Sequence, residues 1–112
     1  MCDKNDLNKI IILVRDIYHS EYKDAIRRVM LYGSYARGDN TEASDIDLVA
    51  IADGDRQELQ KKLKLVWKET AQIGYKYNVI ISPTVIPYDE YEKYKDVLPY
   101  YSNIEKEGIE VE

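Results

Sequence analysis

The stretch Leu31-Tyr-Gly-Ser-Tyr-Ala-Arg-Gly-Asp-Asn-Thr-Glu-Ala-Ser-Asp-Ile-Asp-Leu-Val-Ala-Ile51 decides the expected fold of this chain. Apolar runs on both sides of its polar loop predict two strands, Ile26 to Tyr32 and Ser44 to Ala52. Side chains alternate between the faces of a strand, so Asp45 and Asp47 point to the same side, about 6–7 Å apart at ~3.3 Å per residue. The apolar residues next to them point the other way, into a core.

The residues of this stretch predict binding of a metal ion and of a phosphate group. Two carboxylates side by side repel each other, which predicts a cation between them, and a hard cation such as Mg²⁺ prefers carboxylate oxygens. Upstream, Gly33 ends the first strand and Ser34 opens a short turn. A glycine there lets a phosphate approach the backbone, and the free N–H groups of the turn can hold an anion. Together these features are typical of nucleoside triphosphate chemistry.

The pattern Gly-Ser-x10-Asp-x-Asp, with a serine directly before the first aspartate, resembles the signature of the DNA polymerase β-like nucleotidyltransferase superfamily. The chain is similar to the small branch of minimal nucleotidyltransferases, which includes antitoxins paired with HEPN-domain toxins. The resemblance implies that Asp45 and Asp47 are catalytic and bind two Mg²⁺ ions. It also implies an ATP-binding set, which consists of Gly33, Ser34, Arg37 and Ser44.

Arg37 has two interpretations that the sequence leaves open. Its guanidinium suits phosphate oxygens, because its donors form a planar fork. The alternative is a structural ion pair with Asp39, Glu42 or Asp45 that holds the loop.

The expected fold class is α+β, a single domain over residues 1–112. Helices would pack on one face of a small sheet, and the family resemblance implies that the sheet is mixed. Asp3 is the predicted N-cap of a first helix that runs to about Tyr22, and Asp55 starts a second helix that Gly74 ends. A third strand is predicted from Tyr77 to Ser82. Its continuation past Pro83 would place the proline at a sheet edge or a bulge. A short helix is predicted to start at Pro87, and a helical turn is predicted from Tyr100 to Lys106.

Aromatic residues are assigned by helical period. Trp67 belongs to an apolar stripe on the second helix, which predicts a core position. Near the C-terminus, Tyr91 and Tyr94 are expected in the core. Tyr88, Tyr100 and Tyr101 are expected to stay partly exposed on an acidic surface that helps dock a partner protein.

A departure from the resembled family concerns the third carboxylate, which family members usually carry on the strand that follows the Asp-x-Asp pair. This chain has no Asp or Glu between Glu69 and Asp89. We expect Asn78 or Ile80 nearest to that position. Asn78 has a carbonyl oxygen to offer a metal, but it cannot take a proton.

The short chain lacks the extra domain with which larger nucleotidyltransferases bind an acceptor. The resemblance therefore implies a protein acceptor: transfer of AMP from ATP to a tyrosine hydroxyl of a HEPN toxin (AMPylation), by an antitoxin. Two alternatives remain open. One is an antitoxin that inhibits a toxin by contact alone, and the other is a nucleotidyltransferase acting on a small molecule such as an antibiotic. A homo-oligomer could supply the acceptor pocket that the second alternative needs.

Composition limits the other possibilities. The 16 basic and 21 acidic residues give a net charge of −5, which argues against direct binding of nucleic acid. Cys2 is the only cysteine, which excludes an internal disulfide and fits the cytoplasm. The sequence shows neither a signal-peptide pattern nor an apolar run of membrane-spanning length.

Overall fold

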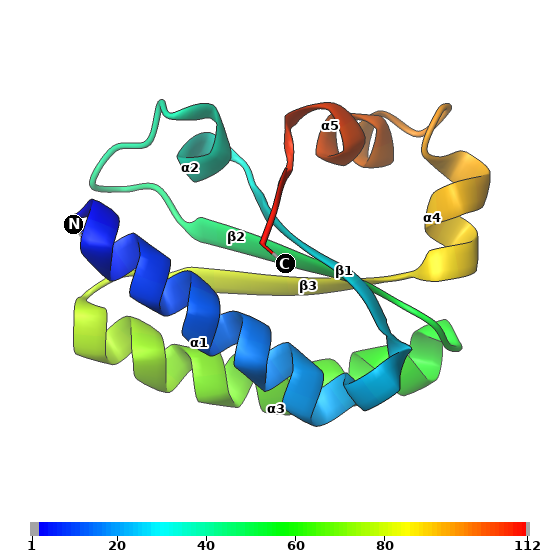
Figure 1. Ribbon diagram of the computed structural model, residues 1–112, viewed down its shortest axis with the longest axis horizontal. Coiled ribbons are helices and arrows are strands. Elements are labelled where there is room, and N and C mark those ends of the chain that lie inside the picture. Colours follow the sequence, from blue (N-terminus) through cyan, green and yellow to red (C-terminus); the bar gives the residue numbers. More distant parts are fainter. Residues whose placement is uncertain (1–2, 112) are drawn as a thin grey trace.

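The computed structural model describes residues 3–111, and Cys2 lies outside that range. Its strands form one sheet in the order β3-β2-β1-β4, in which β1 is antiparallel to β2 and β4 while β2 is parallel to β3 (Figure 1). The predicted mixed α+β fold is confirmed. In chain order the elements are α1 (Lys4–Tyr22), the 3₁₀ turn η1 (Lys23–Ala25), β1 (Ile26–Tyr32), α2 (Ser34–Arg37), β2 (Ile46–Ala52), α3 (Arg56–Tyr77), β3 (Ile81–Pro87), α4 (Tyr88–Tyr94), α5 (Pro99–Glu107) and β4 (Ile109–Glu110).

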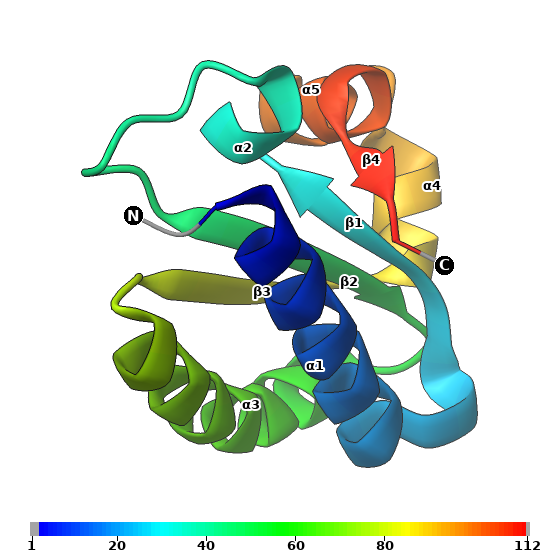
Figure 2. The ribbon, with the colours of Figure 1, turned by 60° about the vertical axis from the view of Figure 1, so that its left-hand side comes forward.

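Helices cover both faces of the sheet, so the expectation of one covered face is wrong. Helices α1 and α3 lie on one face, and α2, α4 and α5 lie toward the other (Figures 1 and 2). The reason is visible in β2, where Leu48 to Ala52 is apolar at every position and fully buried. A strand with two apolar faces needs cover on both. Val49 and Ile51 accordingly join a second core cluster with Tyr91, separate from the cluster under α1 and α3.

The predicted helix starts are confirmed, but the end of α3 is not. Asp3 accepts a hydrogen bond from the Asp6 N–H (2.8 Å) at the start of α1, and Asp55 accepts one from the Glu58 N–H (3.2 Å) at the start of α3. Helix α3 continues past Gly74 to Tyr77, and the left-handed residue Asn78 ends it.

Gly74 has a packing role instead. A Cβ atom at this position would lie 2.6 Å from the backbone oxygen of Val79, so only glycine lets the returning chain pass so close to the helix.

The core assignment of Trp67 is wrong, because its side chain is 46% exposed. The buried residues of α3 follow a single narrow stripe through Leu59, Leu63, Val66 and Thr70. Trp67 is the next residue after Val66, and one residue advances the helix by about 100°. That rotation carries the indole out of the stripe.

The edge strand β3 is attached to β2 partly through a tyrosine of α1. Pro83 pairs with Leu48 in the register and has no N–H to donate. The buried Tyr18 hydroxyl donates to the Leu48 oxygen (2.6 Å) and accepts from the Thr84 N–H (3.0 Å). One side chain therefore joins both strands to the helix beneath them, and the predicted edge position of the proline-containing strand is confirmed.

Removing this hydroxyl should destabilise the protein. Tyr18→Phe leaves a buried carbonyl and a buried N–H without that partner, so we expect a loss of roughly 1–3 kcal/mol in unfolding free energy. Urea denaturation measures it. Tyr94→Phe, which alters an exposed tyrosine, is the control and should change stability little; equal stability of Tyr18→Phe and wild type would contradict the bridging role.

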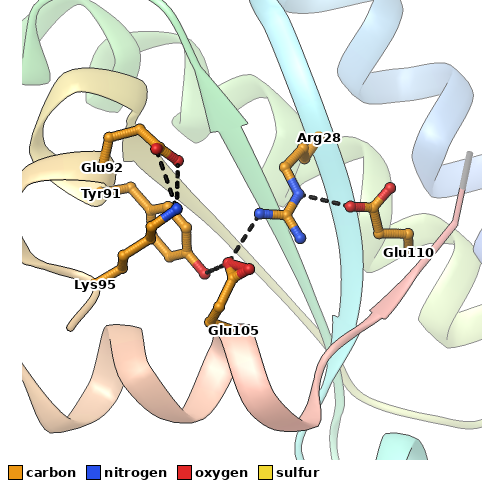
Figure 3. Close-up of polar contacts among 6 residues, drawn as sticks. All are labelled: Arg28, Tyr91, Glu92, Lys95, Glu105 and Glu110. Carbon is orange, nitrogen blue, oxygen red and sulfur yellow. Dashed lines mark hydrogen bonds and ion pairs between the residues drawn. The ribbon is translucent and has the colours of Figure 1, made fainter.

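The C-terminal segment is attached to β1 by the polar network in Figure 3. Glu105 on α5 accepts a hydrogen bond from the buried Tyr91 hydroxyl (2.7 Å) and forms an ion pair with Arg28 of β1 (3.0 Å). Arg28 also pairs with Glu110 of β4 (2.7 Å). Arg28 therefore connects both α5 and β4 to β1.

The tyrosine assignments are only partly right. Tyr91 is buried as expected, and Tyr88 and Tyr100 are at least partly exposed. Tyr94 is exposed because α4 ends there, where the chain turns away from the sheet. Tyr101 is buried because α5 packs back over the sheet and points it toward Tyr91, with ring centroids 5.6 Å apart.

The network predicts a pH-dependent contribution from Glu105. The hydrogen bond from Tyr91, and then the one from Arg28, lower the pKa of Glu105 below its ordinary value of 4.5. A lowered pKa means that the ionised form stabilises the fold above pH 4.5 and that this stabilisation disappears as the pH falls through the folded-state value.

We therefore expect Glu105→Gln to lower the melting temperature by a few degrees at neutral pH, and the gap from wild type to close in acid. Thermal melts monitored by circular dichroism at several pH values measure this gap. Glu92→Gln removes a charge from an exposed pair with Lys95 and serves as the control. A gap that does not depend on pH would show that the charge of Glu105 is unimportant.

Candidate nucleotidyl-transfer site

The end of β1 lies against the carboxylate of Asp47. Tyr32, the last residue of β1, pairs with Asp47 across the antiparallel ladder. The next residue, Gly33, has a φ of +79°, and a Cβ atom there would lie 2.5 Å from Asp47 Oδ2. Both the backbone conformation and the close approach require glycine. This contact fixes the distance between the turn and the metal-binding candidates.

Helix α2 begins directly after Gly33 with Ser34, which is half-buried. The Gly33 oxygen accepts hydrogen bonds from the N–H groups of Ala36 (3.0 Å) and Arg37 (3.1 Å), which closes the turn. Tyr35 is buried in the core and anchors α2 to the sheet. The predicted turn after the first strand is thus a short helix, which the buried Tyr35 anchors to the core and which starts beside Asp47.

The negative charges of Asp45 and Asp47 repel each other. Burial raises the pKa of Asp47, the negative charge of Asp45 raises it further, and Arg37 opposes both effects. Asp45 is exposed just before β2 and accepts a hydrogen bond from the Ser82 hydroxyl (3.3 Å). Two hard oxygen donors that disfavour each other's charge fit a divalent cation by the chemistry of the donor set.

The residue of β3 beside this pair is Ser82, so the expectation of Asn78 or Ile80 is wrong. Ser82 pairs with Asp47 in the parallel register, and Thr84 follows on the same face. Asn78 still belongs to the end of α3, since the helix continues past the predicted boundary. Within residues 3–111, no cluster of three or more potential metal-binding Asp, Glu, His or Cys side chains is present. Hydroxyl groups thus stand where a third carboxylate would.

Comparison with known proteins identifies the family. The model of the nucleotidyltransferase domain family matches residues 11–111. This chain belongs to the nucleotidyltransferase family. Enzymes of this family generally use a divalent metal ion, which agrees with the oxygen donors found here.

Two relatives come from Methanocaldococcus jannaschii. "Putative protein adenylyltransferase MJ0141" is 34% identical over 80% of this chain and 82% of its own length. "Putative protein adenylyltransferase MJ0604" is 35% identical over 80% of this chain and 81% of its own length. Both similarities support assignment of this chain as a nucleotidyltransferase enzyme.

A solved structure shares the fold. A crystal structure of a mutant of the toxin–antitoxin MntA–HpeT contains a chain that is 18% identical in sequence and superposes with a TM-score of 0.54. The match covers 94% of this chain and 71% of that one. Sequence similarity at this level supports the fold alone.

Arg37 of this nucleotidyltransferase is engaged in ion pairs. Its guanidinium contacts Asp39 (3.2 Å) and Glu107 at the end of α5 (3.3 Å). These bonds raise the pKa of Arg37, so the arginine stays charged beside the pair of aspartates. Ion pairing is the structural role that the sequence left open, and nucleotide binding by Arg37 stays a prediction.

Ser44 orders the loop that leads into β2. Its hydroxyl accepts a hydrogen bond from the Thr41 N–H (2.8 Å). This contact holds the backbone just before Asp45. The predicted contact between Ser44 and a nucleotide is a separate matter and stays a prediction.

Tyr100 is a neighbour of the site that the sequence reasoning placed only on a partner surface. Its ring meets that of Tyr32 edge-on, with centroids 5.9 Å apart. Burial raises the pKa of Tyr100 and the charge of Asp47 adds to this rise, while a hydrogen bond with Thr84 opposes it. Because Tyr32 pairs with Asp47 in the sheet, the contact with Tyr32 places the Tyr100 ring near Asp47. No local sequence signal could reveal this, because the contact depends on how α5 packs over the sheet.

The raised pKa of Asp47 predicts a stability gain on substitution. The folded protein binds the Asp47 proton more tightly than the unfolded chain, so the ionised carboxylate lowers stability at neutral pH. We expect metal-free Asp47→Asn to melt at a higher temperature than wild type, by a margin that shrinks as the pH falls toward the ordinary value of 3.8.

Melts in EDTA and in excess Mg²⁺ measure this margin and the metal dependence. Mg²⁺ should raise the melting temperature of wild type but not of Asp47→Asn. Asp24→Asn removes an exposed acid away from the site and should respond to Mg²⁺ like wild type. A variant that Mg²⁺ stabilises as much as wild type would exclude Asp47 as a metal ligand.

Proposed function

We propose that this chain is a Mg²⁺-dependent protein adenylyltransferase that acts as an antitoxin. It would transfer AMP from ATP to a tyrosine hydroxyl of a HEPN-family toxin. The observation that carries the proposal is the approach of Gly33 to Asp47, which places the turn that starts α2 directly beside the carboxylate pair. The names of the two relatives and the toxin–antitoxin origin of the similar fold support the choice of a protein acceptor.

In this proposal each site residue has one task. The backbone at Gly33 and the hydroxyl of Ser34 receive the β and γ phosphates. Asp45 and Asp47 hold the divalent ion, which when bound neutralises phosphate charge and helps the attacking hydroxyl to ionise. Ser82 orients Asp45 through the hydrogen bond already described. Arg37 exchanges one of its carboxylate partners for a phosphate oxygen.

The transfer of AMP needs no reactant other than ATP and the tyrosine hydroxyl. The tyrosine oxygen forms a bond to the α-phosphorus of ATP as the bond from that phosphorus to the β-phosphate bridging oxygen breaks. Pyrophosphate leaves, and the hydroxyl proton passes to water because β3 presents hydroxyls rather than a carboxylate beside the aspartates. AMP adds bulk and negative charge to the toxin, which would block its binding of RNA.

A second candidate function is inhibition of the toxin by contact alone. Ser82 in place of a third carboxylate is the observation that favours it, since the hydroxyl is a weaker metal ligand and a poor base. In that case the aspartates would bind a metal and a nucleotide without turnover, or bind neither.

One experiment separates the two candidates. The purified chain is incubated with Mg²⁺, ATP labelled at the α-phosphate and a purified HEPN-family toxin. We expect label on the toxin, loss of labelling with Asp47→Asn, and several-fold weaker Mg·ATP binding by Ser34→Ala in calorimetry. A toxin that is inhibited without label, or labelled equally by Asp47→Asn, would exclude the proposed catalysis.

A further inference from the structure

A cavity of about 920 Å³ opens at the edge of the sheet beside the aspartates. Its walls come from three places: the loop before β2, the last turns of α3 and the chain that enters β3. Glu42 and Ser44 line it from the loop, Tyr75 from the helix and Ile80 from the β3 side. Of its lining, only Ser44 has a role assigned above.

The cavity carries two strongly exposed large hydrophobic side chains, one of which, that of Tyr75, is the most exposed large hydrophobic side chain of the described residues. Tyr75 is 91% exposed and Ile80 is 63% exposed. Its lining contains one acid, Glu42, and no basic residue, and the exposed Asp45 follows directly after Ser44. Apolar contact area next to the negative charge of Glu42 suits a polypeptide segment with basic side chains.

The cavity adjoins the aspartates along the chain, because Ser44 of its lining directly precedes Asp45. The Ile80 oxygen accepts a hydrogen bond from the Ile46 N–H (2.9 Å), which places Ile80 level with the start of β2. Two residues further along the same strand face, Ser82 bonds Asp45. The exposed Ile80 side chain therefore lies on the edge of the sheet that borders the aspartate pair.

The direction of attack favours this side. Phosphoryl transfer places the attacking and leaving oxygens roughly in line across the phosphorus. In the order β3-β2-β1-β4, the turn at Gly33 follows β1, on one side of the aspartates of β2. A triphosphate held at that turn sends pyrophosphate toward β1. The acceptor then approaches from the β3 side, and the cavity opens there, just before the start of β3.

We propose that this cavity is the acceptor subsite, which binds a basic segment of the partner protein and delivers its tyrosine to the aspartate pair. This inference rests on the proposed function and adds the surface and the chemistry of the acceptor. Ile80 and the ring of Tyr75 provide the apolar contact, and Glu42 pairs with a basic side chain of the segment. The surface differs from the acidic C-terminal one, where Tyr101 is buried and cannot contribute.

A matched pair of variants tests the subsite. The double variant Tyr75→Ser, Ile80→Ser removes the exposed apolar groups, while Leu65→Ser removes a side chain of α3 that is 51% exposed and outside the cavity. With a purified HEPN-family toxin as acceptor, we expect the KM for that protein to rise at least about tenfold in the double variant. Its affinity for Mg·ATP should not change, and Leu65→Ser should behave like wild type.

A crosslinking arm does not depend on turnover. In an Asp47→Asn background, p-benzoylphenylalanine at position 75 should crosslink to the same partner protein, and the same group at position 65 should not. Wild-type transfer with an unchanged KM in the double variant, or crosslinking only from position 65, would overturn the subsite and leave the proposed function intact. Crosslinking from position 75 without any transfer by wild type would remove the proposed function, and would overturn the acceptor role of the cavity while leaving it as a docking surface.

Discussion

The approach of Gly33 to Asp47 is the constraint on which the site depends. It follows from the antiparallel register of β1 and β2, which sets Tyr32 opposite Asp47. The next residue, Gly33, passes so close to the carboxylate that a Cβ atom on it would lie 2.5 Å from Asp47 Oδ2. Any side chain at Gly33 would push the strands apart or displace the carboxylate. The same residue is the N-cap of α2, so the start of this helix is held beside the Asp47 carboxylate.

The two faces of the sheet have different tasks. The face under α1 and α3 holds the larger core, and the Tyr18 hydroxyl fastens β3 to β2 there. The opposite face carries the aspartates at one end and a smaller core under α4 and α5 at the other. Arg28 and Glu105 hold α5 over that face. The packing of α1 and α3 against one face thus positions the strands of the site, and α5 covers part of the other face.

Electrostatics at the site works against stability in the absence of a cation. Burial and Asp45 both raise the pKa of Asp47, and Arg37 relieves the repulsion only in part. A bound divalent ion would convert this unfavourable pair into a favourable one. At Ser82, β3 offers a hydroxyl group to Asp45 rather than a third carboxylate. This limits the electrostatic repulsion at the site, and it also leaves the site without an additional carboxylate base.

The sequence by itself determined the local features. Glycine, serine and the alternating aspartates lie close together along the chain, and strand alternation and helix caps act over a few residues, so the site's two strands, the turn and the starts of α1 and α3 were predictable. The tertiary structure decided the contacts between distant segments. Ser82, rather than Asn78, faces the aspartates because α3 ends later, and that end depends on the packing of Gly74 against Val79. Burial of Tyr101 and the place of Tyr100 beside Asp47 depend likewise on the fold of α5 over the sheet, since a helix's own period cannot show which of its sides finds a partner.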